Sequence, residues 1–241
     1  MPNVLEVNGL EVEYSGRRVV DGLSFSVRRG EIFGFLGPNG SGKSTTIKSL
    51  LGLVFPRAGA VNLHGLSPSN PLSRARIGYM PEDATYYRFL SPEEILKLYG
   101  QLCSVPKAEL SRRVERLLAL VGLSTVAKKQ LGTFSKGMVQ KVSLAQALIN
   151  DPDTLILDEP TTGLDPLAKM QLRQILSDLK KQGKTVFFSS HELSEVELLC
   201  DSILILKSGK ALRTGSLDEV LAGRGAHSLE KFFLQTIQGA P

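Results

Sequence analysis

The stretch "GPNGSGKST" at residues 37–45 carries most of the information on the fold. It fits the pattern G-x-x-x-x-G-K-[ST]. It lies between a short apolar run, "IFGFLG", and a run with a helical pattern, "SGKSTTIKSLLGL". Glycines let backbone N–H groups curl around phosphate oxygens, and the helix that follows adds the positive end of its dipole. The stretch therefore predicts a strand, a phosphate-binding loop and a helix in succession.

Every residue of this phosphate loop (residues 37–45) is a candidate nucleotide ligand. The Lys43 side chain is expected to reach the β- and γ-phosphates, and the Ser44 hydroxyl is expected to hold Mg²⁺. By itself the motif leaves transporter ATPases, GTPases and kinases open. The candidate residues are Gly37, Pro38, Asn39, Gly40, Ser41, Gly42, Lys43, Ser44 and Thr45.

A second motif, "TLILDEP" at residues 154–160, ends an apolar run with two carboxylates. Ligands bind at the carboxyl ends of the strands in open α/β sheets, so Asp158 and Glu159 are expected there. Asp158 suits Mg²⁺, directly or through water. Glu159 is placed to orient and deprotonate an attacking water. The bland alternative is an acidic strand end without a partner, which the nearby phosphate loop disfavours.

Strand and helix patterns alternate on both sides of these motifs, which predicts an α/β fold with a mostly parallel sheet and helices packed around it. The middle of the chain differs. Residues 84–150 read as helices throughout, with Ser91 as an N-cap and Pro92 at the first helical position of one of them. We expect a core of residues 1–83 and 151–215, a helical insert of residues 84–150, and a helical tail of residues 216–241.

Charge is uneven along the chain. The net charge is +5, and residues 84–149 hold ten Lys or Arg against four Glu, so they contribute +6 and the remainder −1. A solvated helix face explains this as well as a surface that meets nucleic acid or an anionic membrane. No apolar run approaches the ~18 residues that span a bilayer. Two distant cysteines, Cys103 and Cys200, indicate a reduced compartment, so we expect a cytoplasmic protein.

Together with "TFSKGMVQ" (residues 133–140), "GLDP" (residues 163–166) and "SSH" (residues 189–191), these motifs resemble the ATP-binding subunit of ABC transporters over nearly the whole chain. The resemblance implies a P-loop NTPase core of the RecA type with an antiparallel β subdomain and an inserted helical subdomain. It implies ATP and Mg²⁺ as cofactors. It makes His191 the contact of the γ-phosphate, Asp165 a residue near a dimer interface, and Tyr14 the aromatic that stacks on adenine. An ordinary strand aromatic remains the alternative for Tyr14.

In that family two ATP-binding domains pack head to tail, and the signature segment of one faces the nucleotide of the other. Here "TFSKGMVQ" stands in that place, and Ser135 reads as the N-cap of a helix whose N-terminus can receive an anion. Ser135 and Gly137 keep the family pattern, whereas Lys136 departs from it. The resemblance leaves open whether Lys136 adds charge at the γ-phosphate or points to solvent.

A second departure is Glu82, which stands where many members have a glutamine between the Mg²⁺ site and the membrane subunit. A glutamate still accepts a hydrogen bond from metal-bound water. Glu82, "SKGM" and the tail "HSLEKFFLQTIQ" are similar to a branch of exporter ATPases.

The resemblance predicts an ATPase that drives a separate membrane permease, favours export, and places the chain peripherally on the cytoplasmic face of the membrane. The expected partners are the permease and a second ATP-binding subunit, identical or related, with no nucleic acid. The alternative is a soluble ATPase of the same superfamily that acts on DNA or the ribosome. Such proteins usually carry a long coiled-coil insertion or two fused ATPase domains, and neither pattern is present here. A nucleotide-binding module without turnover is a further alternative, disfavoured by Lys43, Asp158, Glu159 and His191.

Overall fold

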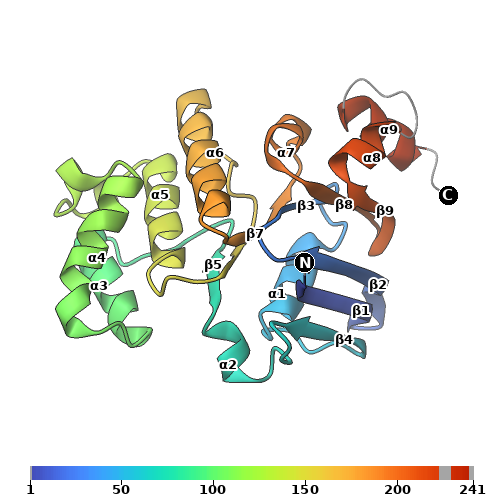
Figure 1. Ribbon diagram of the computed structural model, residues 1–241, viewed down its shortest axis with the longest axis horizontal. Coiled ribbons are helices and arrows are strands. Elements are labelled where there is room, and N and C mark those ends of the chain that lie inside the picture. The colour runs from blue at the N-terminus through green and yellow to red at the C-terminus, as the bar shows by residue number, and fades with distance from the viewer. Residues whose placement is uncertain (1, 223–228, 239–241) are drawn as a thin grey trace.

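The computed structural model describes residues 2–222 and 229–238. Two sheets and the helices around them make up the fold, with an antiparallel sheet at one end and a group of helices at the other (Figure 1). The α/β fold with a mostly parallel sheet, an antiparallel β subdomain and inserted helices is therefore confirmed.

The larger sheet has six strands in the order β5-β6-β7-β3-β8-β9, parallel except for the antiparallel pair β8 and β9. β3 is an inner strand of this sheet, and the phosphate loop follows it directly. The two carboxylates, Asp158 and Glu159, follow β6. Both motifs thus lie at the carboxyl edge of one sheet. The strand bounds are β3 Ile32–Leu36, β5 Ile77–Met80, β6 Thr154–Leu157, β7 Thr185–Ser190, β8 Ser202–Lys207 and β9 Lys210–Ser216.

The smaller sheet packs on one face of this core. Its strands are β1 (Asn3–Tyr14), β2 (Arg17–Arg28) and β4 (Ala58–Leu63), in the antiparallel order β2-β1-β4. Between the two sheets, Phe25 stacks on Phe33 and Phe35 with ring centroids 5.7 and 5.6 Å apart. Phe33 in turn stacks on Phe187 at 5.8 Å. Stacked buried rings give this layer a large apolar contact of defined geometry.

Three helices of the insert form the group at the left of Figure 1: α3 (Pro92–Leu102), α4 (Lys107–Leu120) and α5 (Lys136–Ala147). The predicted start of α3 is confirmed as a full capping box between Ser91 and Glu94. The predicted N-cap of α5 is also confirmed, since Ser135 Oγ accepts a hydrogen bond from the backbone N–H of Met138 at 3.3 Å. Short 3₁₀ turns at Ser124–Val126 and Leu131–Thr133 connect α4 to α5.

Close backbone approach joins the insert to the sheet. A Cβ on Gly78 of β5 would lie 2.0 Å from the Ala147 carbonyl oxygen at the end of α5. Only glycine fits there, and it lets α5 run directly beside the sheet edge. The remaining helices are α1 Lys43–Leu50, α2 Pro71–Arg74, α6 Pro166–Lys181, α7 Leu193–Leu199, α8 Leu217–Ala222 and α9 Leu229–Gln238.

Part of the predicted tail lies outside the described residues, namely 223–228 and 239–241, including the start of "HSLEKFFLQTIQ". Its described part folds as α8 and α9, and α9 contacts α7. Buried Leu229 and Phe232 of α9 join the larger hydrophobic core. The division into core, insert and tail at residues 84, 150 and 215 remains a prediction.

Candidate functional site

The phosphate loop is shaped by its glycines and by Lys43. Gly42, which precedes α1, has φ of 108°, and a Cβ there would lie 2.9 Å from the Val19 carbonyl oxygen. The Lys43 ammonium folds back into the loop and donates to the carbonyl oxygen of Gly37 at 2.7 Å. The loop therefore already encloses a positive charge and presents the N-terminus of α1 beside it, the arrangement that phosphate groups bind.

Glu159 lies directly opposite this lysine. Its Oε1 is 3.3 Å from the Lys43 ammonium, and both side chains are buried. Glu159 adopts a left-handed backbone with φ of 49°, which a non-glycine residue rarely takes. Strained backbone of this kind clusters at functional sites, where the surroundings hold it in place.

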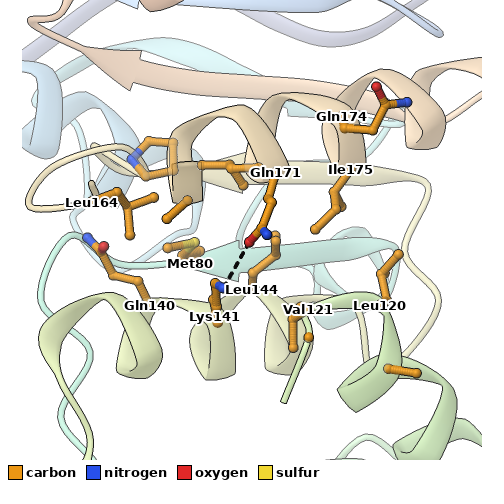
Figure 2. Close-up of a pocket in the computed structure, with 15 residues that line it drawn as sticks. Met80, Leu120, Val121, Gln140, Lys141, Leu144, Leu164, Gln171, Gln174 and Ile175 are labelled. Carbon is orange, nitrogen blue, oxygen red and sulfur yellow. Dashed lines mark hydrogen bonds between the residues drawn. The ribbon is translucent and has the colours of Figure 1, made fainter. Parts of the chain in front are cut away.

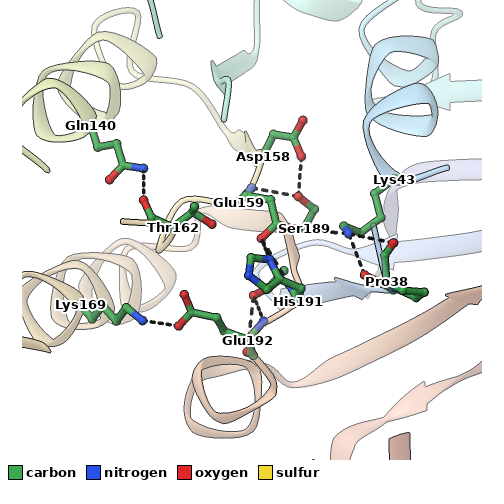
Figure 3. A network of polar contacts seen from close by, with 12 residues as sticks. Pro38, Lys43, Gln140, Asp158, Glu159, Thr162, Lys169, Ser189, His191 and Glu192 are labelled. Atoms are coloured by element: carbon green, nitrogen blue, oxygen red, sulfur yellow. Dashed lines mark hydrogen bonds and ion pairs between the residues drawn. The ribbon is translucent and has the colours of Figure 1, made fainter. Parts of the chain in front are cut away.

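Ser189 connects the two acidic residues (Figure 3). Its hydroxyl donates to Asp158 Oδ1 at 2.6 Å, and it accepts from the backbone N–H of Glu159 at 2.9 Å. Burial raises the pKa of Asp158, although hydrogen bonds from Ser189 and Ser44 act in the opposite direction. Asp158 and Ser44 are thus neighbours, as a shared Mg²⁺ would require.

His191 follows β7 and contacts the carboxylate of Glu159. Its Nδ1 lies 2.8 Å from Glu159 Oε2, within hydrogen-bonding distance, while the ring stays half exposed. A carboxylate partner favours the tautomer with the proton on Nδ1, which leaves Nε2 directed to the solvent side. The imidazole is thereby oriented by Glu159 and accessible to a ligand.

Lys43, Glu159 and His191 line a hollow of about 470 Å³. A volume of this size suits the polar part of a nucleotide. Glu82 and Thr162 complete its wall, from the segment after β5 and the loop after β6. The predicted residues that line it are Asn39, Gly40, Gly42, Lys43, Ser44, Thr45, Glu82, Glu159 and His191.

Other predicted residues lie outside this hollow. Tyr14 ends β1, is 45% exposed, and belongs to the same hairpin as Val19, which does line the hollow. Ser135, Lys136 and Gly137 begin α5 in the insert. Asp165 caps α6 by accepting from the backbone N–H of Ala168 at 2.9 Å. Within a single chain these five residues do not line the hollow, and their contact with nucleotide remains a prediction.

Sequence reasoning missed two polar residues of the site region. Ser189 lies in "SSH", at the end of β7 and two residues before His191, and that spacing was the available signal. Gln140 is buried, and its Nε2 donates to the Thr162 carbonyl oxygen at 2.6 Å (Figure 3). No local pattern predicted that contact, because it joins the insert to the loop after β6.

The donor set fits Mg²⁺ better than a softer metal. Among the described residues, no three His, Cys, Asp or Glu side chains gather into a metal cluster of their own. Ser44 and Asp158 offer the oxygen ligands that Mg²⁺ takes together with substrate phosphates and water. Within residues 2–222 and 229–238, no helix has the length and apolar character to cross a bilayer.

A phosphate loop between a central parallel strand and a helix, with two acidic residues at the end of another parallel strand of the same sheet, defines a P-loop NTPase. A family model described as "ABC transporter" matches residues 20–162. The chain belongs to the ABC transporter family, in which this domain binds and hydrolyses ATP.

Relatives and solved structures agree with this assignment. An uncharacterised ABC transporter ATP-binding protein of Synechocystis is 50% identical over 83% of this chain and 57% of its own length. The chain thus spans little more than half of that relative. A Nod factor export ATP-binding protein I of Ralstonia nicotianae is 39% identical over 90% of this chain and 68% of its own length.

A solved ATP-binding subunit of an ABC transporter superposes with a TM-score of 0.90 at 35% identity. The superposition covers 97% of this chain and 99% of the other. The similarity therefore extends over the insert and both sheets, and not only over the phosphate loop.

Proposed function

We propose that this chain hydrolyses ATP with Glu159 as the general base and powers a separate membrane permease. The observation that supports it most strongly is the single hollow in which Lys43, Glu159 and His191 meet. Lys43 binds the β- and γ-phosphates, Glu159 accepts the proton of the attacking water, and His191 contacts the γ-phosphate.

Mg²⁺ is the proposed cofactor beside ATP. Ser44 and Asp158 would hold it, and Glu82 would accept a hydrogen bond from one of its waters. When bound, the ion neutralises charge that develops on the phosphates. The role of the chain is to place these oxygens around the phosphate loop and to keep Asp158 oriented through Ser189.

We further propose a head-to-tail dimer around two ATP molecules. In one chain, Ser135, Lys136 and Gly137 lie outside the hollow, so a second copy or a related subunit is needed to bring them to the nucleotide. Ser135 caps α5 and leaves its N-terminus available to an anion. Tyr14 would stack on adenine from the hairpin beside the phosphate loop, and Asp165 would lie near the dimer interface.

An exposed aromatic pair supports the proposed permease partner. Tyr87 and Phe89 are 66% and 67% exposed, and their rings lie 5.6 Å apart. They lie on the same loop segment as Glu82, a few residues further along the chain, so a protein that binds this pair would act on the segment that contributes Glu82 to the hollow. We propose that the permease docks here and that the chain acts at the cytoplasmic face of the membrane. Export is favoured by the relative named for Nod factor export.

The experiment that tests this function is a pull-down of the tagged Glu159→Gln variant from gently solubilised cells in ATP and Mg²⁺. Retained proteins are identified by mass spectrometry, and the same eluate is assayed for nucleic acid. A multi-spanning protein in stoichiometric amount is the expected result. Ribosomes or DNA without such a protein would overturn the transporter proposal in favour of a soluble ATPase.

A further inference from the structure

Lys136, the residue that departs from the family signature, contacts two other segments of its own chain. Its ammonium lies 3.3 Å from Oδ1 of Asp83, the residue that follows Glu82 in the chain. Its aliphatic stem crosses Gly163, where an added Cβ would lie 3.2 Å from Lys136 Cδ. The side chain therefore bridges the segment after β5 and the loop after β6.

Two neighbours on α5 face the same loop. A Cβ on Gly137 would lie 3.3 Å from Leu164 Cδ2, and Gln140 donates to the Thr162 carbonyl oxygen at 2.6 Å. The backbone N–H of Thr162 donates to the carbonyl oxygen of Glu159 at 3.2 Å. The start of α5 thus lies along residues 162–164, which are tied to the proposed base.

Farther along α5, a hollow of about 350 Å³ separates this helix from α6 (Figure 2). Side chains of the two helices point toward each other across it, and Lys141 donates to Gln171 Oε1 at 3.0 Å. Close packing, which would otherwise fix the angle between two helices, is interrupted at this place. Contacts at the first turn of α5 therefore contribute more to the orientation of this helix.

Electrostatics explains why Lys136 has an acidic partner. It occupies the first position of α5, at the positive end of the helix dipole, and this first turn holds no acidic residue. Asp83 supplies the opposite charge from another segment. The side chains of Lys136 and Asp83 are 53% and 79% exposed, so their ion pair shifts an equilibrium by at most about fivefold. It biases an orientation without locking it.

We propose that Lys136 is a positioning residue that holds the start of α5 against Asp83 and Gly163 and so sets the orientation of the insert relative to the phosphate loop. Because residues 162–164 connect to Glu159, the same contact orders the loop that carries the proposed base. Only the kinetic part of the test below rests on the proposed role of Glu159.

The direct test measures the distance between insert and core by electron spin resonance of two nitroxide labels on the full chain. Cys103 at the end of α3 is exposed and carries one label. Ser26→Cys on the exposed face of β2 carries the other. Cys200 is buried, and burial raises the pKa of its thiol, so it resists labelling.

In the nucleotide-free chain we expect one narrow distance distribution. Lys136→Ala and Asp83→Asn should broaden it, Lys136→Arg should preserve it, and the charge exchange Asp83→Lys with Lys136→Asp should restore it. Lys129→Ala removes one charge from an exposed position of the insert and should change nothing. A Lys136→Ala distribution equal to that of the unchanged chain, or a charge exchange no better than its single substitutions, would overturn the proposal.

The second readout is steady-state ATP hydrolysis. Lys136→Ala should lower kcat by up to about fivefold, and Lys136→Arg should recover most of it. If the unchanged chain hydrolyses no ATP, the proposed function fails while the distance measurement still decides the role of Lys136. A lower kcat in Lys136→Ala that Lys136→Arg does not recover would count against positioning by charge.

Discussion

The Lys43 ammonium lies 3.3 Å from Glu159 Oε1, and both side chains are almost fully buried. The proposed phosphate-binding cation and the proposed base are therefore ion-pair partners within one chain. Under the proposed function, a triphosphate bound at Lys43 would give this ammonium a second anionic partner, and Glu159 would keep its contact with His191, 2.8 Å away. The ion pair would in that case couple phosphate binding to the release of the proposed base.

Glu159→Gln is expected to lower ATP turnover by about 10²–10⁴-fold, the usual contribution of a general base. ATP binding should persist, because the amide keeps the size of the side chain and Lys43 keeps its hydrogen bond to the Gly37 carbonyl oxygen. Turnover is measured by phosphate release and binding by a fluorescent nucleotide. Glu192→Gln is the matched control, since that carboxylate pairs with Lys169 and should leave turnover near normal. Normal hydrolysis by Glu159→Gln would remove Glu159 from its role.

Asp158→Asn is expected to stabilise the nucleotide-free chain at neutral pH. Burial raises the pKa of Asp158 above its unfolded value, so ionisation at neutral pH disfavours the folded state. The stability gained by the amide should vanish as pH falls through the folded pKa toward about 4, the usual range of the free side chain. Thermal melts at several pH values without Mg²⁺ measure this difference.

Asp178→Asn provides a control of opposite sign. Hydrogen bonds from Gln174 and Lys181 lower the pKa of this exposed carboxyl. Its substitution should therefore weaken the folded state slightly at neutral pH and have no effect once pH lies below the folded pKa. A neutral-pH loss of stability in Asp158→Asn would show that its hydrogen bonds outweigh its burial.

Gly78→Ala is expected to destabilise the fold by about 1–3 kcal/mol or more, the range for overpacked sites. The new Cβ would meet the Ala147 carbonyl oxygen at 2.0 Å, and backbone on both sides must shift. Urea unfolding monitored by circular dichroism gives the free energy of unfolding. Gly215→Ala is the control, because its Cβ would find its nearest neighbours at an ordinary 3.6 Å. Equal stability of both variants would contradict a tight contact between α5 and β5.

Tyr87→Ser with Phe89→Ser is expected to abolish recovery of the permease in the pull-down and to leave the ATPase rate of the isolated chain within about twofold, as for surface substitutions generally. Both rings are mostly exposed, so the fold loses little by their removal. Leu198→Ser on α7, also mostly exposed, is the control and should retain the partner. Full recovery of the permease by the double variant would move the docking surface elsewhere.

The sequence predicted those parts of the site that depend on local chemistry. Residues 37–45 and the acidic pair after β6 follow from patterns within a strand and its turn, and the Ser91 N-cap followed from a local pattern in the same way. The larger sheet places β3 between β7 and β8, an order that no local pattern contains. The fold class, in contrast, followed from the alternation of strands and helices.

Contacts between distant segments could not be predicted from the sequence, because no local pattern contains them. Ser189 joins Asp158 to Glu159 because β6 and β7 are adjacent in the sheet. Lys136 meets Asp83 because α5 packs beside β5. Residue type allowed each contact, but only tertiary packing selected it. From the sequence, Lys136 could either contact a phosphate or point to solvent. The ion pair with Asp83 was not predicted.

The aromatic layer of Phe25, Phe33, Phe35 and Phe187 also determines where nucleotide binding can be observed by hydrogen exchange. Amides of β3 and β7 lie in the centre of the larger sheet behind this layer, so they should exchange only on global unfolding, with or without ATP. Added protection must therefore be sought in residues 37–42, 81–90 and 131–140, which lie in loops or at helix ends. In such an experiment the exchange rates of the β3 and β7 amides are a constant internal reference, and the exchange rates of the loops and helix ends report ligand binding.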